Sequence, residues 1–387
     1  MQCNLCLSSD IENIYTPINS LESLVINICS DCGLVFADKN FNKIKLNDET
    51  NFRNLSCDAD YSSVRVGKAQ MVPKAVKLFE DLIDDKNHIR RVLDMSSARG
   101  HFAYKAIEYF PSCIVDCIEP DKYMTTEYTY SDRIKIFNGK YKTFDNNRSY
   151  NLIYSCHSLE HYRNPFENLK WIEKKLDING FFYVEVPNIE AINNSINIDE
   201  FFYDMHLYYF DNKNLYRMLN QANFEVLADN SDNGNLAFLC KKSKIKINPS
   251  DSSSFIENKN LIEAYKANIE KNRHLIRKNS DRLSDFLNNS QNKVMIVGAG
   301  RILDFLVKYC SVNLPKNLTL VDNFLSEATD TLYGLRVHKL TNVKDFKGIN
   351  AILILAKTSS VELKKDIKAN WPEAKIYTLD DFIKDWQ

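Results

Sequence analysis

The pattern of apolar and polar positions changes period along the chain. In its middle part, short apolar runs at Arg91–Asp94, Cys113–Ile118 and Tyr150–Tyr154 alternate with stretches of helical spacing. This order is typical of a parallel α/β sheet. A charged stretch from about Ile256 to Leu287 has helical character, and a strand, a glycine turn and a helix follow from Lys293. The sequence therefore predicts two α/β units.

These changes of pattern divide the chain into four parts. We expect an N-terminal domain at residues 1–65, an α/β domain at 66–245, a polar and helical linker at 246–290, and a second Rossmann-like α/β domain at 291–387. The linker begins with a polar run at 248–254 whose Asn, Pro, Ser and Asp residues are typical of a loop. A length of 387 residues fits two or three hydrophobic cores.

Charge and hydropathy exclude several classes of protein. The 50 Lys and Arg residues nearly balance the 51 Asp and Glu residues, so no overall field attracts nucleic acid or an anionic membrane. No apolar run reaches the roughly 20 residues that span a bilayer, and Met1–Asp10 lacks the basic start and apolar core of a signal peptide. We expect a cytoplasmic protein with no nucleic-acid or membrane partner.

Two close pairs of cysteines lie near the N-terminus. Cys3 and Cys6 form one pair, Cys29 and Cys32 form the second, and 22 residues separate the two pairs. Four thiolates at this spacing can surround one Zn²⁺ tetrahedrally, and four protein ligands leave no open position, so we expect a structural zinc. Redox or free-thiol pairs are the alternative, although a redox pair needs no second copy.

The first strand of the central domain runs into a turn of small residues. Asp94 ends the strand, Ser96 and Gly100 lie in the turn, and a helix follows through Tyr109. Small residues let such a turn approach a ligand closely. Glu119 follows the second strand, where an acid can accept hydrogen bonds from the ribose hydroxyls of an adenosine ligand.

A later strand of the same domain opens into a segment that contains His157, Glu160 and His161. Asn164-Pro165 then carries a helix-start signal, since Asn is a favourable cap and Pro fits the first turn. We expect this helix to end at Asn179-Gly180 and the next strand to cover Phe181 to Val186.

Taken together and in order, these segments resemble class I S-adenosylmethionine methyltransferases. They are the turn at 93–100, Glu119-Pro120, Leu159-Glu160-His161 with Asn164-Pro165, the strand Val184–Asn188, and Asp204-Met205-His206-Leu207 followed by Phe210. The usual glycine-rich turn of that class is reduced here to Asp94 and Gly100. We expect a cofactor site made of Asp94, Ser96, Gly100, Glu119, Pro120 and His157.

A narrower resemblance covers nearly the whole chain. Nucleotide-sugar C-methyltransferases, which act on dTDP-4-keto-deoxysugars, combine an N-terminal zinc-binding domain, a central methyltransferase domain and a C-terminal Rossmann-like domain. Their cofactor turn is also poor in glycine, and the turn at 96–100 is similar to it. The resemblance implies S-adenosylmethionine and structural Zn²⁺ as cofactors and a nucleotide sugar as substrate.

The same resemblance implies catalytic residues. Carbon methylation next to a ketone needs a base and a donor that holds the enolate oxygen, and Tyr61, His161, Tyr203 and His206 match the Tyr and His residues of that family. Met205 stands where the family has a glutamate, which leaves methyl transfer better supported than C-methylation. His206 can instead orient a loop, His161 can cap a helix or pack beneath the cofactor, and Tyr61 can be a packing residue.

The C-terminal domain carries a second glycine turn. The strand Val294–Val297 runs into Gly298 and Gly300, and Asp322 follows at a distance suited to a ribose contact. The third glycine position of a dinucleotide site is Leu303, so we favour a domain that closes over the nucleotide of the substrate over an NAD site.

The sequence thus leaves three hypotheses for function. The leading one is methyl transfer to a nucleotide-activated sugar, with C-methylation favoured and His206 or His161 as base. An O- or N-methyltransferase for a related sugar or small metabolite is the second. A non-catalytic zinc-containing scaffold is the third.

Overall fold

The computed structural model describes residues 1–17, 24–38, 68–126, 128–129, 131–144, 147–193, 200–202, 206–243, 253–343, 346–356 and 360–383. These residues form two compact units. The first contains the described residues of 1–50, 68–194 and 202–264, and the second contains residues 200–201 and those from 265 onward.

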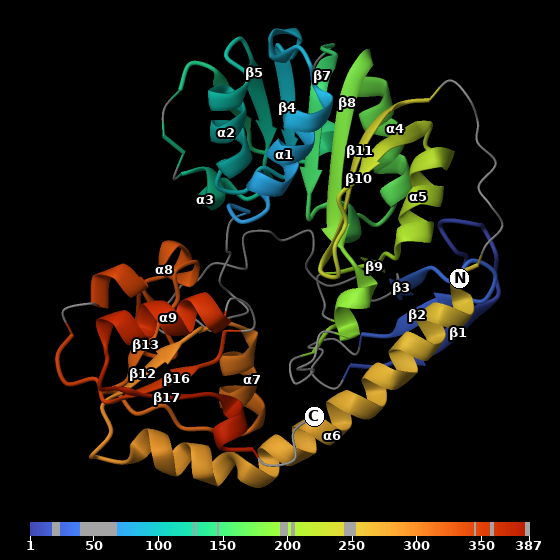
Figure 1. The fold of residues 1–387 in the computed structure, drawn as a ribbon. Helices are drawn as coiled ribbons and strands as arrows, with labels where there is room; N and C mark the ends of the chain where they lie inside the picture. The colour runs from blue at the N-terminus through green and yellow to red at the C-terminus, as the bar shows by residue number, and fades with distance from the viewer. Residues whose placement is uncertain are drawn as a thin grey trace. The chain divides into compact units, whose positions relative to one another are not determined.

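A seven-stranded sheet forms the centre of the first unit (Figure 1). Its order is β10-β11-β8-β7-β4-β5-β6, and all neighbours are parallel except β11, which is antiparallel to β8 and to β10. The strands are β4 (Arg91–Met95), β5 (Ile114–Ile118), β6 (Ile134–Phe137), β7 (Tyr150–Cys156), β8 (Leu176–Pro187), β10 (Phe224–Asp229) and β11 (Asn235–Lys242). The strand order reverses between β4 and β7, and parallel sheets bind ligands at the carboxyl end of such a reversal.

Helices cover this sheet and build its core. They are α1 (Val72–Leu82), α2 (His101–Tyr109), α3 (Lys122–Thr125), α4 (Pro165–Lys175) and α5 (Asn212–Gln221). Phe79 of α1 contacts Phe102 of α2 and Tyr183 of β8 edge to face, and Phe102 stacks on Tyr154 of β7. These rings are buried, and aromatic burial of this kind fixes both helices on the sheet.

Our expectation for the end of α4 is wrong. The helix stops at Lys175, four residues before Asn179, and β8 already begins at Leu176. Leu176 is buried and extended, and it pairs with Tyr150 of β7. Strand pairing of this buried leucine therefore ends the helix earlier than the local sequence signal at Asn179-Gly180 indicates. The predicted cap is confirmed, because the Asn164 side chain accepts a hydrogen bond from Glu167 N–H at 3.1 Å.

A small antiparallel sheet belongs to the same unit. Its order is β1-β2-β3-β9, with strands β1 (Ile11–Tyr15), β2 (Ile26–Cys29), β3 (Val35–Ala37) and β9 (Tyr208–Tyr209). The first three strands come from the N-terminal region, whereas β9 comes from the chain between β8 and α5. Val35 and Phe36 pair with Tyr209 and Tyr208, so the N-terminal region and the central domain share one sheet.

The second unit has its own parallel sheet, in the order β14-β15-β13-β12-β16-β17. Its strands are β12 (Val294–Val297), β13 (Thr319–Val321), β14 (Thr331–Leu332), β15 (Leu335–His338), β16 (Ala351–Ile354) and β17 (Lys375–Tyr377). Its helices are α7 (Arg301–Tyr309), α8 (Leu325–Ala328) and α9 (Ser360–Asn370). All neighbours are parallel except β14 and β15, and the order reverses between β12 and β16.

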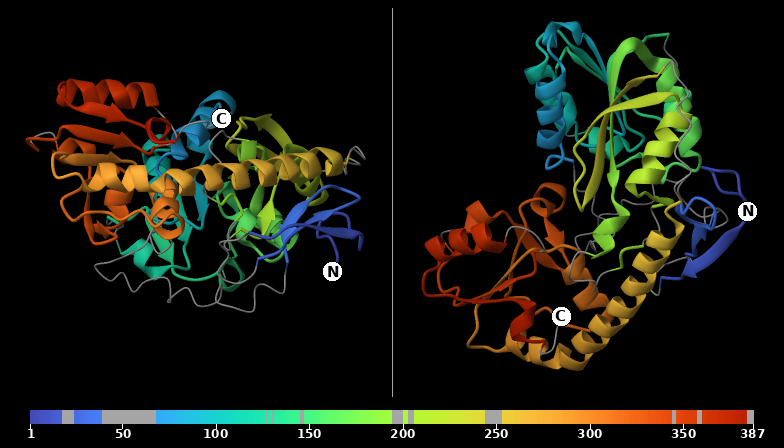
Figure 2. Two further views of the ribbon diagram at one scale, coloured as in Figure 1. Left: turned by 90° about the horizontal axis from the view of Figure 1, so that it is seen from below. Right: turned by 45° about the vertical axis from the view of Figure 1, so that its right-hand side comes forward.

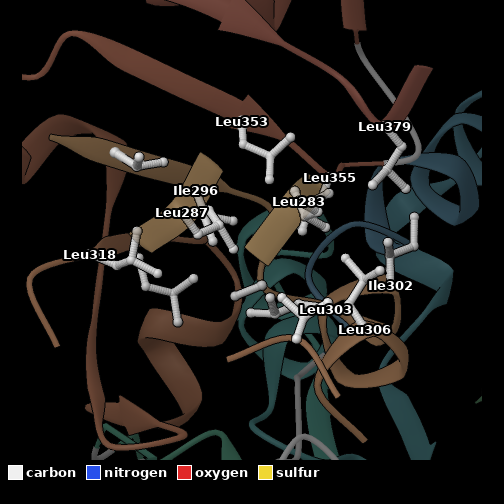
Figure 3. Packing of buried hydrophobic residues seen from close by; sticks show 14 of the residues in the cluster. Leu283, Leu287, Ile296, Ile302, Leu303, Leu306, Leu318, Leu353, Leu355 and Leu379 are labelled. Carbon is white, nitrogen blue, oxygen red and sulfur yellow. The ribbon is translucent and has the colours of Figure 1, made fainter. Parts of the chain in front are cut away.

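One long helix, α6 (Phe255–Asn288), starts in the first unit and ends in the second, and it is continuous in both views of Figure 2. Its C-terminal part presents Leu283 and Leu287 to a core that contains Ile296 and Leu353 (Figure 3). The α/β fold predicted from the sequence is confirmed for the central domain.

Candidate functional site

The turn between β4 and α2 lies at the reversal of the central sheet. Ser96 and Ala98 have positive φ angles of 53° and 50°, and Gly100, the N-cap of α2, has a φ of 76°. A Cβ atom at Gly100 would lie 2.7 Å from the ring of Tyr128. The single glycine is therefore required by both conformation and space. The turn is tight although only one glycine remains.

Glu119, which follows β5, holds this turn in place. One oxygen of its carboxylate accepts the N–H of Ala98 at 2.7 Å, and the other accepts the N–H of Asp121 at 2.9 Å. An ionised carboxylate offers about four acceptor positions, so acceptor capacity remains for ribose hydroxyls. Glu119 is only 7% exposed, and burial raises its pKa while these two amides oppose that rise.

Asp94 lies at the end of β4 and is almost fully buried. Its Oδ2 has no hydrogen-bond partner among the described residues. Burial raises the pKa of Asp94 to about 8, and the positive charge of Lys68 opposes the rise. An unpaired buried acceptor at a ligand-binding strand end fits a bound cofactor with a hydrogen-bond donor.

Lys68 bridges the two strands at the reversal, and our sequence reasoning missed it. Its ammonium donates to the carbonyl oxygen of Ser96 at 2.8 Å and to the carbonyl oxygen of Cys156. These atoms follow β4 and end β7, so Lys68 spans the crevice where parallel sheets bind ligands. Burial raises the pKa of Asp94 and of Glu119, and the positive charge of Lys68 offsets part of this rise.

His161 and His206, the two predicted bases, lie together. Their ring centroids are 4.8 Å apart and the rings meet edge to face. Both Nε2 atoms face one oxygen of Glu160, at 3.6 Å from His161 and 3.8 Å from His206. Glu160 is completely buried, and burial raises its pKa to about 8. The sequence did not assign Glu160 a role, although it is adjacent to His161.

Two backbone hydrogen bonds position His206. The N–H of Leu207 donates to the carbonyl oxygen of Glu160 at 2.9 Å, and the N–H of Ala37 donates to the carbonyl oxygen of Leu207 at 2.9 Å. The N-terminal sheet therefore holds the segment that carries His206 against the end of β7. Tyr61 and Tyr203, the predicted catalytic tyrosines, and Met205 lie outside the described residues.

His157 lies at the same strand end with a positive φ of 46°. Its Nε2 pairs with Oδ1 of Asn235 at 3.0 Å, and its Nδ1 is 3.8 Å from Glu160. Burial is the main cause that lowers the pKa of His157 to about 3, which keeps the ring neutral. Pro120, predicted with Glu119 for the cofactor, directly precedes the Asp121 amide that Glu119 binds.

The four N-terminal cysteines converge. The Sγ atoms of Cys3 and Cys32 are 3.6 Å apart, those of Cys6 and Cys29 are 3.4 Å apart, and all four lie within 4.8 Å of one another. Sulfurs about 2.3 Å from a tetrahedral Zn²⁺ lie about 3.8 Å apart, so the set fits zinc after small adjustments. Gly33 has a φ of 77°, and its N–H donates to the carbonyl oxygen of Cys29 at 2.8 Å.

The turn after β12 in the second unit has a related arrangement. The N–H of Ala299 donates to Oδ2 of Asp322 at 3.0 Å, and the N–H groups of Phe324 and Leu325 donate to Oδ1 at 3.0 and 2.9 Å. Asp322 therefore orders its own loop and the glycine turn at the same time.

The central part of the chain matches a known family. Residues 68–229 match the family model described as a methyltransferase domain. The first unit therefore contains a methyltransferase domain. The chain is a methyltransferase, as predicted. A search of curated proteins found no match.

Solved structures similar to the chain include several methyltransferases. They include an S-adenosylmethionine-dependent methyltransferase from Clostridium acetobutylicum, with 11% identity over 48% of this chain and 93% of that chain and a TM-score of 0.37. The 1,6-didemethyltoxoflavin-N1-methyltransferase of Burkholderia thailandensis has 17% identity, coverages of 45% and 78%, and a TM-score of 0.36. Human N-acetylserotonin methyltransferase has 12% identity, coverages of 45% and 52%, and a TM-score of 0.38.

The described part of the chain contains no helix that is both long and apolar enough to cross a membrane.

Proposed function

We propose that the protein transfers the methyl group of S-adenosylmethionine to a nucleotide-activated sugar. The favoured reaction is C-methylation beside a ketone, in which His206 or His161 removes the proton from the carbon that receives the methyl group. The observation that carries the proposal is the meeting of these two histidines, 45 residues apart in sequence, at the carboxyl end of β7.

The cofactor part of the site supports methyl transfer at that place. S-adenosylmethionine supplies an electrophilic methyl group when bound. Glu119 has acceptor positions for the ribose hydroxyls, and Asp94 and the Ser96 turn lie at the carboxyl end of β4, where the strand order reverses. The histidines lie at the end of the neighbouring strand, within reach of a substrate bound beside the cofactor.

The N-terminal region contributes to the proposed function through positioning. We propose that Cys3, Cys6, Cys29 and Cys32 bind one structural Zn²⁺, which fixes the loops around β2. The same sheet includes β9, which follows His206. Zinc would therefore stabilise the segment that carries a proposed catalytic residue.

O- or N-methylation of a related sugar or metabolite is the second candidate. It is favoured by one observation, the Met205 that replaces the glutamate of the sugar C-methyltransferases. A methyl acceptor that is already an oxygen or a nitrogen needs a base but no enolate.

Two measurements test the proposal. Calorimetric titration with S-adenosylhomocysteine should show one binding site per chain, and absence of binding would contradict methyl transfer. Incubation of dTDP-4-keto-6-deoxy sugars with donor that carries a ¹³C-methyl group should give a product whose carbon spectrum shows a C–CH₃ group. A methyl signal in the O–CH₃ or N–CH₃ range supports the second candidate, and no product from any nucleotide sugar rejects this substrate class.

A further inference from the structure

Glu160 is a buried carboxylate whose side-chain oxygens have no hydrogen-bond partner among the described residues. Its exposed fraction is 0%, and neither Oε1 nor Oε2 accepts a hydrogen bond from the described residues. The nearby ammonium of Lys68 donates instead to Ser96, Cys156 and Ser158. Burial of an ionised carboxylate without a partner is very costly, and an unsatisfied group of this kind is often explained by an ion.

Three imidazole nitrogens point at the same oxygen of this carboxylate. Nε2 of His161, Nε2 of His206 and Nδ1 of His157 lie 3.6, 3.8 and 3.8 Å from Oε1 of Glu160. Hydrogen bonds between nitrogen and oxygen are about 2.7–3.2 Å long, so these distances are too long for direct bonds. Two ligand atoms about 2.1 Å from one metal ion in tetrahedral geometry lie about 3.4 Å apart. The observed spacing is close to that value.

The hydrogen bond of His157 agrees with an ion at this place. Oδ1 of Asn235 can only accept, so Nε2 of His157 donates to it. The neutral ring then presents the lone pair of Nδ1 to the carboxylate oxygen. Two lone pairs that face each other repel unless a proton or a cation lies between them, and metal-binding histidines commonly donate their other N–H in this way.

We propose that Glu160, His161 and His206 bind a divalent first-row transition-metal ion, with His157 as an additional ligand. Imidazole and carboxylate ligands suit Zn²⁺, Mn²⁺ or Fe²⁺. The ligand atoms of Glu160, His161 and His206 all lie within 4.8 Å of one another. This site is separate from the four cysteines, and the proposal does not depend on the proposed substrate.

A bound ion would define the chemistry of the substrate side. Three or four protein ligands leave at least one open position for an oxygen of the substrate, which the ion would polarise as a Lewis acid. An Nε2 atom of His161 or His206 that binds the ion cannot also accept a proton, so the proposed base role of these histidines applies to the ion-free protein. With the ion bound, these histidines act as ligands and the substrate must be one with a coordinating oxygen.

Manganese is the probe that tests this site, because Mn²⁺ prefers nitrogen and oxygen ligands while thiolates select zinc. Full-length protein is titrated with Mn²⁺ without substrate or cofactor, and free Mn²⁺ is measured by electron paramagnetic resonance. We expect one Mn²⁺ per chain, and at least tenfold weaker binding in Glu160→Gln and in His161→Ala. His274→Ala, an exposed histidine on α6, is the matched control and should bind like the wild type.

The same variants separate loss of ligands from loss of folding. Circular dichroism should show native helix content in Glu160→Gln, and Mn²⁺ should raise the melting temperature of the wild type but not of this variant. Absence of Mn²⁺ binding by folded wild-type protein overturns the proposal. Equal binding by the wild type, Glu160→Gln and His161→Ala also overturns it, because the ion would then be adventitious. Methyl transfer is not measured here, so failure of this proposal leaves the proposed function standing.

Discussion

Glu119 and Ala98 form the link that shapes the cofactor turn, a hydrogen bond of 2.7 Å from a backbone amide to a buried carboxylate. The second unit repeats it with Asp322 and Ala299 at 3.0 Å. In both sheets an acid after the second strand accepts an amide of the turn after the first strand. The acid therefore orders the turn before any ligand binds, which explains how a turn with few glycines keeps its shape.

Glu119 both holds the Ala98 amide and is placed to accept the ribose hydroxyls, and the first prediction follows from these two roles. Replacement of Glu119 by Ala removes the ribose acceptor and leaves the Ala98 amide without its partner. Loss of matched polar partners costs about 1–3 kcal/mol, so S-adenosylhomocysteine should bind about 5- to 150-fold more weakly. Calorimetry measures the affinity, and Glu108→Ala on the exposed face of α2 is the control. Unchanged affinity in folded Glu119→Ala would refute the placement of the ribose.

The second prediction concerns Asp94 and pH. Burial raises its pKa in the folded protein to about 8, whereas an unfolded aspartate has a pKa of about 3.9. Between these values the folded state holds a proton that the unfolded state has released. The free energy of unfolding should therefore fall as pH rises from about 4 to about 8, by at most about 1.4 kcal/mol per pH unit.

Asp94→Asn provides the comparison, because an amide does not titrate and the other groups are shared. Urea unfolding of the two proteins without cofactor at pH 5 and pH 7 measures the difference. We expect the variant to gain stability relative to the wild type as pH rises. Parallel pH dependence in both proteins would show that Asp94 is not perturbed by burial.

Much of the central fold could be predicted because its signals are local. The apolar runs gave β4, β5 and β7, and the Asn164-Pro165 pair gave the start of α4. The end of α4 could not be predicted in this way, since pairing of Leu176 with Tyr150 decides it. Strand β9 was missed for the same reason. It has only two residues, Tyr208 and Tyr209, and exists because β3 lies beside it.

The site could be predicted only in part, because distant residues complete it. The sequence singled out His161 and His206 through motifs, but not the carboxylate of Glu160 that both approach. Lys68 has no motif, and its position becomes visible only when Ser96 and Cys156 lie at adjacent strand ends. The position of Glu160 directly before His161, a predicted base, is the sequence signal that could have pointed to it.

The third prediction tests the zinc site. The wild type should contain one tightly bound zinc at the four cysteines, and Cys29→Ser should lose it because one thiolate of the tetrahedral set is missing. Elemental analysis after dialysis against EDTA, which should strip the histidine site, measures the metal content. Cys310→Ala, a buried cysteine of the second unit, should keep its zinc. Full zinc content in Cys29→Ser would disprove the assignment.

The last prediction concerns the chemistry at His206. A 4-keto sugar nucleotide incubated in D₂O with EDTA-dialysed enzyme, whose histidine site is free of metal, and without methyl donor should exchange a proton beside the ketone, since proton removal precedes C-methylation. His206→Ala should abolish this exchange and lose about 10² to 10⁴ in turnover, the usual loss for a general base. It should still bind S-adenosylhomocysteine normally, because Glu119, and not His206, is placed for the ribose. Exposed His274→Ala should exchange like the wild type. Absence of exchange in the wild type favours O- or N-methylation. If His206→Ala keeps near-normal turnover, His206 only orients its loop, and His161, whose ring lies 4.8 Å away, becomes the candidate base.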